Sequence, residues 1–356
     1  MCLRKKRESK SSWSKYWIVN SSDEVVGKIK ELNMKGEASS VGSFDFSTLY
    51  TKLEHERLKA KLKWAIETAF ESRAGSVLAV YKQRAKWVEK PRSETVVIDA
   101  AGLVELVEFL IDNLVIVYGE QAYRQVIGIP MGTDCAPFLA NLYLFVLEYE
   151  WVSVQEQTEE GRERLRVLVL VGRYIDDLFA VNGERVLAAC LLELYQGLEV
   201  KKESKTTFRS HFLDLDIVVN DGRLVLATYD KRDAFPFEVR SYPNLAGNVH
   251  GKKSHGTIVG QLRRFAQACD HWNDFSNRLK TLTGKLLEQG FDRERLRVVI
   301  GRFLKQRGLQ VSKYSKSLES FVEGCFTQQA AQGKVERAGS RQRNRKRSKQ
   351  KRKKGR

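Results

Sequence analysis

The sequence predicts an α/β (α+β) fold, in which an antiparallel sheet is backed by helices and followed by a helical bundle. Short β-branched runs at 166–171 and 178–181 flank two adjacent acids, as expected for a hairpin. A second hairpin is predicted at 212–229, where an Asp-Gly pair separates two apolar runs. After residue 255 the apolar residues recur at helical spacing, which predicts the bundle.

The composition indicates a folded core with basic ends. Of the 356 residues, 42% are hydrophobic, which is enough for two or three packed units. The net charge of +18 is concentrated at 337–356, with twelve Lys or Arg and no acid, and at 1–15, with six basic residues and one acid. Such segments attract nucleic acid or anionic surfaces, and the run at 343–354 is typical of a nuclear localisation signal. A solvated tail without a dedicated partner has the same composition.

The sequence lacks the patterns of several protein classes. Its five cysteines form no C-x-x-C pair, so neither a zinc ribbon nor a redox motif is present, and a scattered, odd set is typical of a reducing compartment. The basic N-terminus has no apolar signal segment. Acids interrupt the apolar run at 96–118, which we interpret as an amphipathic helix rather than a membrane span. We expect an intracellular, nuclear protein without a membrane partner.

The first predicted elements are a helix and a strand. A helix capped by Ser21 or Ser22 is followed by a strand near 43–51. In that strand Phe44 and Phe46 share one face, so Asp45 points to the other, as any polar residue of an amphipathic strand would. We expect residues 52–125 to be mostly helical, including a helix at 103–117.

The segment QVIGIPMGTDCAP at 125–137 is the second informative stretch. Gly128 and Gly132 bracket Pro130 in a loop without bulky side chains, and Thr133 or Asp134 can cap the helix that follows. Such a loop lets the backbone approach a base, sugar or phosphate closely. A purely structural turn before a core helix would have the same pattern. We expect a charged connector at 152–165.

The acids Asp176 and Asp177 occupy the turn of the first predicted hairpin. Adjacent carboxylates repel each other unless a cation binds them, and Mg²⁺ takes one or two protein carboxylates together with water or substrate phosphates. An ordinary polar turn would also contain Asp. Nucleotidyl transfer by two metal ions needs acids from separate strands, and Asp45 and Asp176 would supply them.

Three motifs together resemble those of reverse transcriptases, most closely those of Penelope-like retrotransposons. FDFSTLYT at 44–51 is similar to the first palm motif, GIPMGTDCAP at 128–137 to the second, and RYIDD at 173–177 to the third. FLDL at 212–215 and YDKRD at 229–233 resemble strands near the primer grip, and QLRR at 261–264 resembles the thumb. The similarity runs from about residue 19 to 303.

The resemblance implies an RNA-directed DNA polymerase, a nucleotidyltransferase that uses two Mg²⁺ (or Mn²⁺) ions, an RNA template, a DNA primer and dNTPs. It implies that Tyr50 excludes a ribose 2′-hydroxyl, which disfavours an RNA-templated RNA polymerase. It also implies that a lysine protonates pyrophosphate, without choosing among Lys201, Lys202 and Lys205. The expected site residues are Asp45, Asp176 and Asp177 as catalytic and metal-binding, Phe46, Tyr50, Gln125, Gly128, Pro130 and Gly132 as nucleotide-binding, and Lys231, Arg232, Arg263 and Arg264 as nucleic-acid-binding.

The chain departs from the family in its fingers region, because fewer than fifty residues precede Asp45. We therefore expect an N-terminally truncated right-hand polymerase with incomplete fingers. The alternative is a catalytically inactive, reverse-transcriptase-derived protein that binds nucleic acid. The expected division is 1–40 for a basic arm and fingers remnant, 41–240 for a palm with a helical insertion at 52–125, 241–330 for a helical thumb, and 331–356 for a disordered basic tail.

Overall fold

The computed structural model describes residues 16–306 and 318–327, apart from positions 74, 83, 94, 238, 246 and 250–255. The basic arm and tail predicted at the two ends lie outside these residues. The chain divides into two compact units at Val225–Leu226, which is earlier than the predicted boundary at 240. The prediction of a mixed α/β chain with antiparallel sheets and helices is confirmed.

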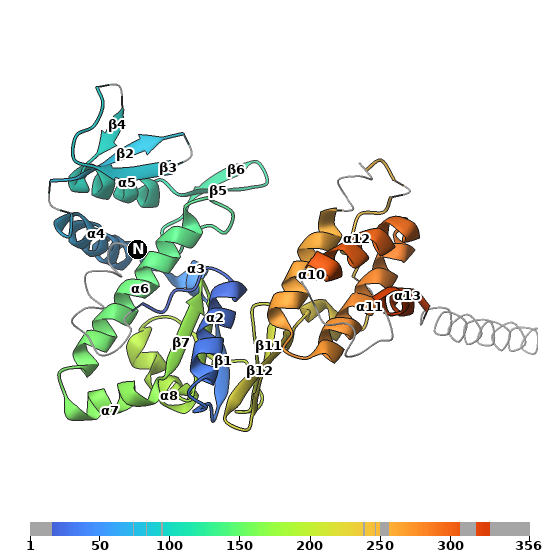
Figure 1. Ribbon diagram of the computed structural model, residues 1–356. Helices are drawn as coiled ribbons and strands as arrows, with labels where there is room; N and C mark the ends of the chain where they lie inside the picture. Colours follow the sequence, from blue (N-terminus) through green and yellow to red (C-terminus); the bar gives the residue numbers. More distant parts are fainter. Residues whose placement is uncertain are drawn as a thin grey trace, which may run out of the picture. The chain divides into compact units, whose positions relative to one another are not determined.

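The first unit contains most of the helices and strands (Figure 1). Its helices are α2 (Ser22–Asn33), α3 (Leu49–Lys52), α4 (His55–Glu71), α5 (Ala100–Asp112), α6 (Ala136–Gln155), α7 (Glu159–Val167) and α8 (Glu184–Leu194). Its strands are β1 (Val41–Phe46), β2 (Val77–Tyr81), β3 (Arg84–Val88), β4 (Val96–Ile98), β5 (Val115–Tyr118), β6 (Gln121–Arg124), β7 (Leu170–Tyr174), β8 (Asp177–Val181), β9 (Val200–Lys202), β10 (Arg209–Phe212), β11 (Leu215–Asn220) and β12 (Arg223–Thr228), the last of which reaches into the second unit.

A four-stranded sheet with the order β7-β8-β1-β9 is central to this unit. All three strand pairs are antiparallel. Figure 1 shows the long helix α6 running beside the sheet, and the buried Phe44 and Leu178 belong to the same core cluster as Leu144 of α6. One face of the sheet is therefore buried in the core. This fixes the register of every strand, because a slip by one residue would turn the apolar side chains outward.

Two local predictions at the start of the chain are confirmed. Ser21 caps α2 by accepting a hydrogen bond from the Glu24 amide, and the apolar stripe of that helix is buried. In β1, Phe44 and Phe46 are buried on one face while Asp45 is half-buried on the other. The hairpin predicted at 212–229 is also present, with a turn in which Asp221 and Gly222 both have positive φ.

Other predictions were wrong in detail. The region 52–125 is not mostly helical, since 77–98 forms the three-stranded sheet β3-β2-β4 and 115–124 forms the hairpin β5-β6. The helix expected at 103–117, within the apolar run 96–118, is α5 and ends at Asp112. The connector at 152–165 is largely helical. Cys135, rather than Thr133 or Asp134, occupies the N-cap position of α6, and its side chain makes no capping hydrogen bond. Among the described residues, none of the helices is both long and apolar enough to cross a bilayer.

The second unit is the predicted helical bundle. It contains the short 3₁₀ helix η1 (Lys231–Ala234) and the helices α10 (Gly256–Ala268), α11 (Trp272–Glu288), α12 (Arg293–Gln306) and α13 (Leu318–Thr327). Apolar residues at helical spacing meet in one buried cluster, in which Leu262, Leu279 and Ile300 are completely enclosed. Figure 1 shows these helices packed against one another in orange and red.

Candidate active site

The strand register places two of the predicted acids opposite each other. Asp45 on β1 is the partner of Asp177 on β8, and on its other side Asp45 is the partner of Lys201 on β9. Directly opposed residues of antiparallel strands project from the same face of a sheet. Asp177, Asp45 and Lys201 therefore form a row on one face, whereas Phe44 and its partner Leu178 lie on the buried face.

Asp176 lies in a two-residue turn that is conformationally strained. Tyr174 pairs with Asp177, which leaves only Ile175 and Asp176 to connect β7 and β8. Ile175 has φ 54°, a left-handed conformation that costs a β-branched residue roughly 1–3 kcal/mol. The carbonyl of Asp176 accepts a hydrogen bond of 3.2 Å from the Phe46 amide. The turn is thereby attached to the end of β1, which contains Asp45.

The charges at this turn influence one another. Burial raises the pKa of the Asp176 carboxyl, and the neighbouring Asp45 carboxylate raises it further, against the effect of a hydrogen bond from the backbone of Asp176 itself. Burial also raises the pKa of the Tyr50 hydroxyl, with a second contribution from the charge of Asp176. The Asp176 carboxyl is therefore close enough to both Asp45 and Tyr50 for electrostatic interaction with each.

These carboxylates are suited to a divalent cation whose remaining coordination positions are filled by the substrate. A cation would relieve the repulsion between Asp45 and Asp176, and carboxylate oxygens are the ligands that Mg²⁺ prefers. Within the described ranges, no group of three or more His, Cys, Asp or Glu could by itself hold a metal ion. Mg²⁺ commonly takes only one or two carboxylates and leaves its other positions to water and substrate phosphates. Asp45 and Asp176 match that arrangement, with Asp177 next to Asp45 in the row.

The glycine-rich loop lies against the segment that follows β1. The Gly128 amide donates to the Leu53 carbonyl at 2.7 Å, and the Ile129 amide donates to the Tyr50 carbonyl at 2.8 Å. Gly128 has φ +77°, and a Cβ atom there would lie 2.5 Å from the Tyr50 oxygen. His55 Nε2 is 2.7 Å from the carbonyl oxygen of Gly128. Only glycine allows this approach, so the predicted loop and Tyr50 form one surface.

Gln125 adds an unsatisfied acceptor to this surface. Its Nε2 donates to the Ile127 carbonyl at 2.9 Å, whereas its buried Oε1 has no hydrogen-bond partner among the described residues. A buried polar atom without a partner is costly and is often a ligand or water site. Pro130 is half-buried in the same loop, and Gly132 has φ +107° with open space around it.

The Phe46 side chain is not part of this surface. It is 5% exposed and its ring packs edge-on against Tyr195, with centroids 4.7 Å apart. Because it lies on the face opposite Asp45, its side chain cannot contact a nucleotide beside the acids. The reason is the alternation of the strand, which points Phe46 into the core.

A buried polar cluster behind the turn escaped the sequence analysis. Arg173 and Glu148 are both fully buried and form a bidentate ion pair, and the Tyr195 hydroxyl donates to Glu148 at 2.9 Å. Burial raises the pKa of Glu148, and the guanidinium of Arg173 opposes that rise. The available signal was an acid within the apolar sequence of α6, at a position that faces the core.

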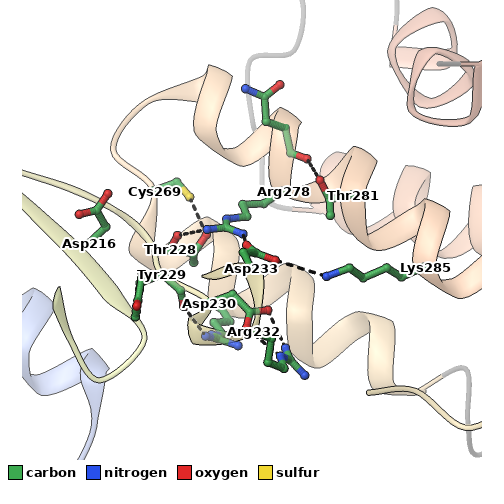
Figure 2. Close-up of polar contacts among 12 residues, drawn as sticks. Asp216, Thr228, Tyr229, Asp230, Arg232, Asp233, Cys269, Arg278, Thr281 and Lys285 are labelled. Atoms are coloured by element: carbon green, nitrogen blue, oxygen red, sulfur yellow. Dashed lines mark hydrogen bonds and ion pairs between the residues drawn. The ribbon is translucent and has the colours of Figure 1, made fainter. Parts of the chain in front are cut away.

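The second unit has an open pocket lined by cationic and tyrosine side chains. Arg264, Arg278 and Lys285 contribute to it. Figure 2 shows Arg278 and Lys285 extending from α11 toward Asp233, to which both are ion-paired. Arg278 also donates to the Thr228 carbonyl at 2.7 Å, and Arg264 donates to the Tyr229 carbonyl at 3.2 Å.

The residues predicted to bind nucleic acid are only partly brought together. Arg264 lines the pocket, whereas Arg263, the preceding residue of α10, is exposed. Arg232 makes two 2.7 Å hydrogen bonds to Asp230, a lining residue whose pKa these contacts lower to about 2. Lys231 is exposed.

Comparisons with known proteins give matches in structure alone. No protein-family model and no curated protein matches the chain. Telomerase from Candida albicans, in complex with the TWJ fragment of telomeric RNA, is 14% identical and matches 91% of this chain and 56% of its own, with a TM-score of 0.45. Telomerase from Candida tropicalis in the same kind of complex is 13% identical, with 92% and 56% covered and a TM-score of 0.46.

A viral polymerase matches this chain with a comparable sequence identity and TM-score. The Sicinivirus 3Dpol RNA-dependent RNA polymerase is 12% identical and matches 80% of this chain and 53% of its own, with a TM-score of 0.43. The chain thus spans about half the length of these structures. Since these TM-scores lie below 0.5, the fold is defined here by the strand order and register given above.

Proposed function

We propose that this chain is the palm and thumb portion of an RNA-directed DNA polymerase, which adds deoxynucleotides to the 3′-hydroxyl of a primer on an RNA template. The observation that supports this most is the register that sets Asp45 opposite Asp177, with Asp176 in the adjoining turn. A retrotransposon of the Penelope-like type and a nuclear location are the finer parts of the proposal. They rest on the motifs and on the basic end of the sequence.

In this proposal each site residue has a separate task. Asp45 and Asp176 hold the metal, and Asp177 supports them. Two Mg²⁺ or Mn²⁺ ions, when bound, would activate the primer hydroxyl and stabilise the charge on the departing pyrophosphate. Tyr50 lies beside the sugar and rejects a 2′-hydroxyl. The backbone of the loop approaches the new base pair at Gly128, where the unsatisfied Oε1 of Gln125 provides an acceptor.

The register also favours Lys201 over Lys202 as the candidate proton donor, and Lys205 lies beyond β9, the strand that pairs with β1. Lys201 is the partner of Asp45 and projects from the same face, whereas Lys202 is the partner of the buried Phe44 and projects from the opposite face. The Lys201 Nζ lies 3.0 Å from a carboxylate oxygen of Glu199. We therefore assign the protonation of pyrophosphate to Lys201.

Lys201→Ala is expected to slow single-nucleotide incorporation by roughly 10²-fold, because a positioned acid contributes about that much to a proton-transfer step. Lys202→Ala is the matched control, one residue further along the same strand, and should change the rate far less. Rapid-quench measurement of one incorporation step tests this. Equal losses for the two variants would remove Lys201 from the assignment.

In the second unit, the pocket around Arg264, Arg278 and Lys285 is proposed to contact the nucleic-acid backbone. Guanidinium and ammonium groups bind phosphates by charge, and such binding weakens steeply with salt. The two tyrosines that line the pocket, Tyr229 and Tyr242, offer flat surfaces for a sugar or base. This role does not require the acids of the first unit.

Primer extension on poly(rA)/oligo(dT) with Mg²⁺ or Mn²⁺ tests the proposed function. Extension with dTTP but not with UTP is the expected result, and a matched poly(dA) template measures the preference for RNA. Extension with UTP alone would identify an RNA polymerase. Salt-sensitive binding of the primer-template without extension would instead favour a non-catalytic protein that binds nucleic acid through its second unit.

A further inference from the structure

Arg173 is the largest fully buried side chain in the part of the chain that the structure describes. Its five N–H groups all have partners. Nε donates a hydrogen bond to one carboxylate oxygen of Glu148, and Nη2 donates a hydrogen bond of 3.2 Å to the other. Asn141 accepts two more, at 2.5 Å through Oδ1 and at 3.2 Å through its backbone carbonyl. The last donor bonds the carbonyl of Ile175 at 3.0 Å.

These contacts connect three parts of the first unit. Glu148 and Asn141 belong to α6, whose first residue follows the glycine-rich loop. Arg173 is the penultimate residue of β7, two positions before Ile175, which is the turn residue with positive φ. Tyr195, just after α8, completes the cluster through its bond to Glu148. One guanidinium therefore contacts both the helix that begins at the loop and the turn that contains Asp176.

We propose that Arg173 is a positioning residue, whose guanidinium holds the Ile175 carbonyl and so keeps Asp176 beside Asp45. The inference rests on the proposed function for its meaning, because Asp176 is there a metal ligand. The orientation of the Ile175 carbonyl follows directly from the backbone angles of the turn. A hydrogen bond to this carbonyl thus selects the left-handed conformation, which a β-branched residue would otherwise leave.

The chemistry of the cluster explains why the residue is arginine. A planar guanidinium presents five donors in a fixed fork, whereas a lysine ammonium has three donors at a single point. Lysine could not reach Glu148, Asn141 and Ile175 at once. A buried ion pair can often be replaced by apolar side chains of similar size without loss of stability, so the pair alone does not explain the arginine. What an apolar pair cannot replace is the bond to the turn.

The test separates positioning from stability. Arg173→Met combined with Glu148→Met removes both charges together and is expected to be destabilised far less than Arg173→Met alone, which leaves the Glu148 carboxylate buried and unpaired. Single-turnover incorporation should nevertheless fall by about 10²-fold, the usual effect of a small displacement in an active site. Hydrogen exchange at 174–178 should become faster while exchange in α6 is unchanged. Adding Ile175→Gly, which makes positive φ favourable, should restore a large part of the rate.

Tyr195→Phe is the matched control, since it removes a bond to Glu148 but none of the five contacts of the guanidinium. It should retain wild-type exchange at the turn. Wild-type exchange and incorporation in the Met/Met variant would overturn the inference, as would a failure of Ile175→Gly to improve that variant. If the wild type itself does not polymerise, the proposed function fails, and hydrogen exchange with its glycine rescue still decides whether Arg173 holds the turn.

Discussion

Asp176→Asn is expected to reduce nucleotide incorporation by about 10³-fold or more, while the folded protein becomes no less stable at neutral pH. In the proposed function Asp176 is a metal ligand, and the loss follows from its removal, because metal-bound charge stabilisation contributes several kcal/mol and each 1.36 kcal/mol is tenfold in rate. Asparagine has nearly the same size, so the turn and its bond to the Phe46 amide can persist. Rapid-quench incorporation and urea unfolding measure the two effects.

The pH dependence gives this prediction a second readout. The folded-state pKa of Asp176 is raised, first by burial and then by Asp45. A carboxyl whose pKa is higher in the folded state contributes stability at pH values below its unfolded pKa, and that contribution disappears as the pH rises through the folded pKa. Relative to the wild type, Asp176→Asn should therefore become more stable as the pH rises from acid to neutral. Added Mg²⁺ should reduce this difference by stabilising only the wild type.

Asp221→Asn provides the control for this experiment. Asp221 lies in another two-residue hairpin turn of the same unit, is exposed, and has a positive φ that asparagine also tolerates. It should change neither incorporation nor the response of stability to Mg²⁺. Undiminished incorporation by Asp176→Asn would remove Asp176 from the catalytic site, and a metal response equal to the wild type would remove it as a ligand.

Gly128→Ala should produce the largest loss of stability among the site variants, about 3 kcal/mol or more. The φ of +77° costs any L-residue about 1 kcal/mol or more, and overpacking typically adds 1–3 kcal/mol. The added Cβ would meet the Tyr50 carbonyl oxygen at 2.5 Å. That oxygen accepts the Ile129 amide, so the loop must move away and lose a hydrogen bond. Urea unfolding of Gly128→Ala, beside the comparison variant described next, measures the loss.

Gly132→Ala is the matched comparison, because Gly132 also has a positive φ but nothing within 4 Å of an added Cβ. Its free energy of unfolding should fall only by the cost of placing alanine at positive φ, about 1 kcal/mol. The difference between the two variants then measures the contact between the loop and Tyr50. Equal losses would show that the close approach at Gly128 contributes nothing.

Patterns with short sequence separation were sufficient to predict several elements. The alternation of Phe44, Asp45 and Phe46 identified the buried and open faces of β1, because the side-chain period of a strand is local. Ser21 as a cap, the Asp-Gly turn at 221–222 and the apolar spacing of the bundle have the same origin. The hairpin at the two adjacent acids was also predictable, since turn residues are selected by neighbours within a few positions, but its turn consists of Ile175 and Asp176, and Asp177, predicted in the turn, begins β8.

Features that depend on distant partners were not predictable. Residues 77–98 and 115–124 lie in a region that was expected to be mostly helical, because short apolar runs fit either period and only pairing with other strands decides between them. Phe46 was placed at the nucleotide, although its contact with Tyr195 points it into the core.

The sequence by itself determined the three motifs, their order, and which residue types could bind metal and nucleic acid. Tertiary structure decided which of them meet. The pairing of β1 with β9 distinguishes Lys201 from Lys202, because a shift of one residue exchanges the faces of a strand. The contacts among Arg173, Glu148 and Asn141 join residues 25 and 32 positions apart. No local periodicity records such contacts, since they form only when the helix and the sheet pack together.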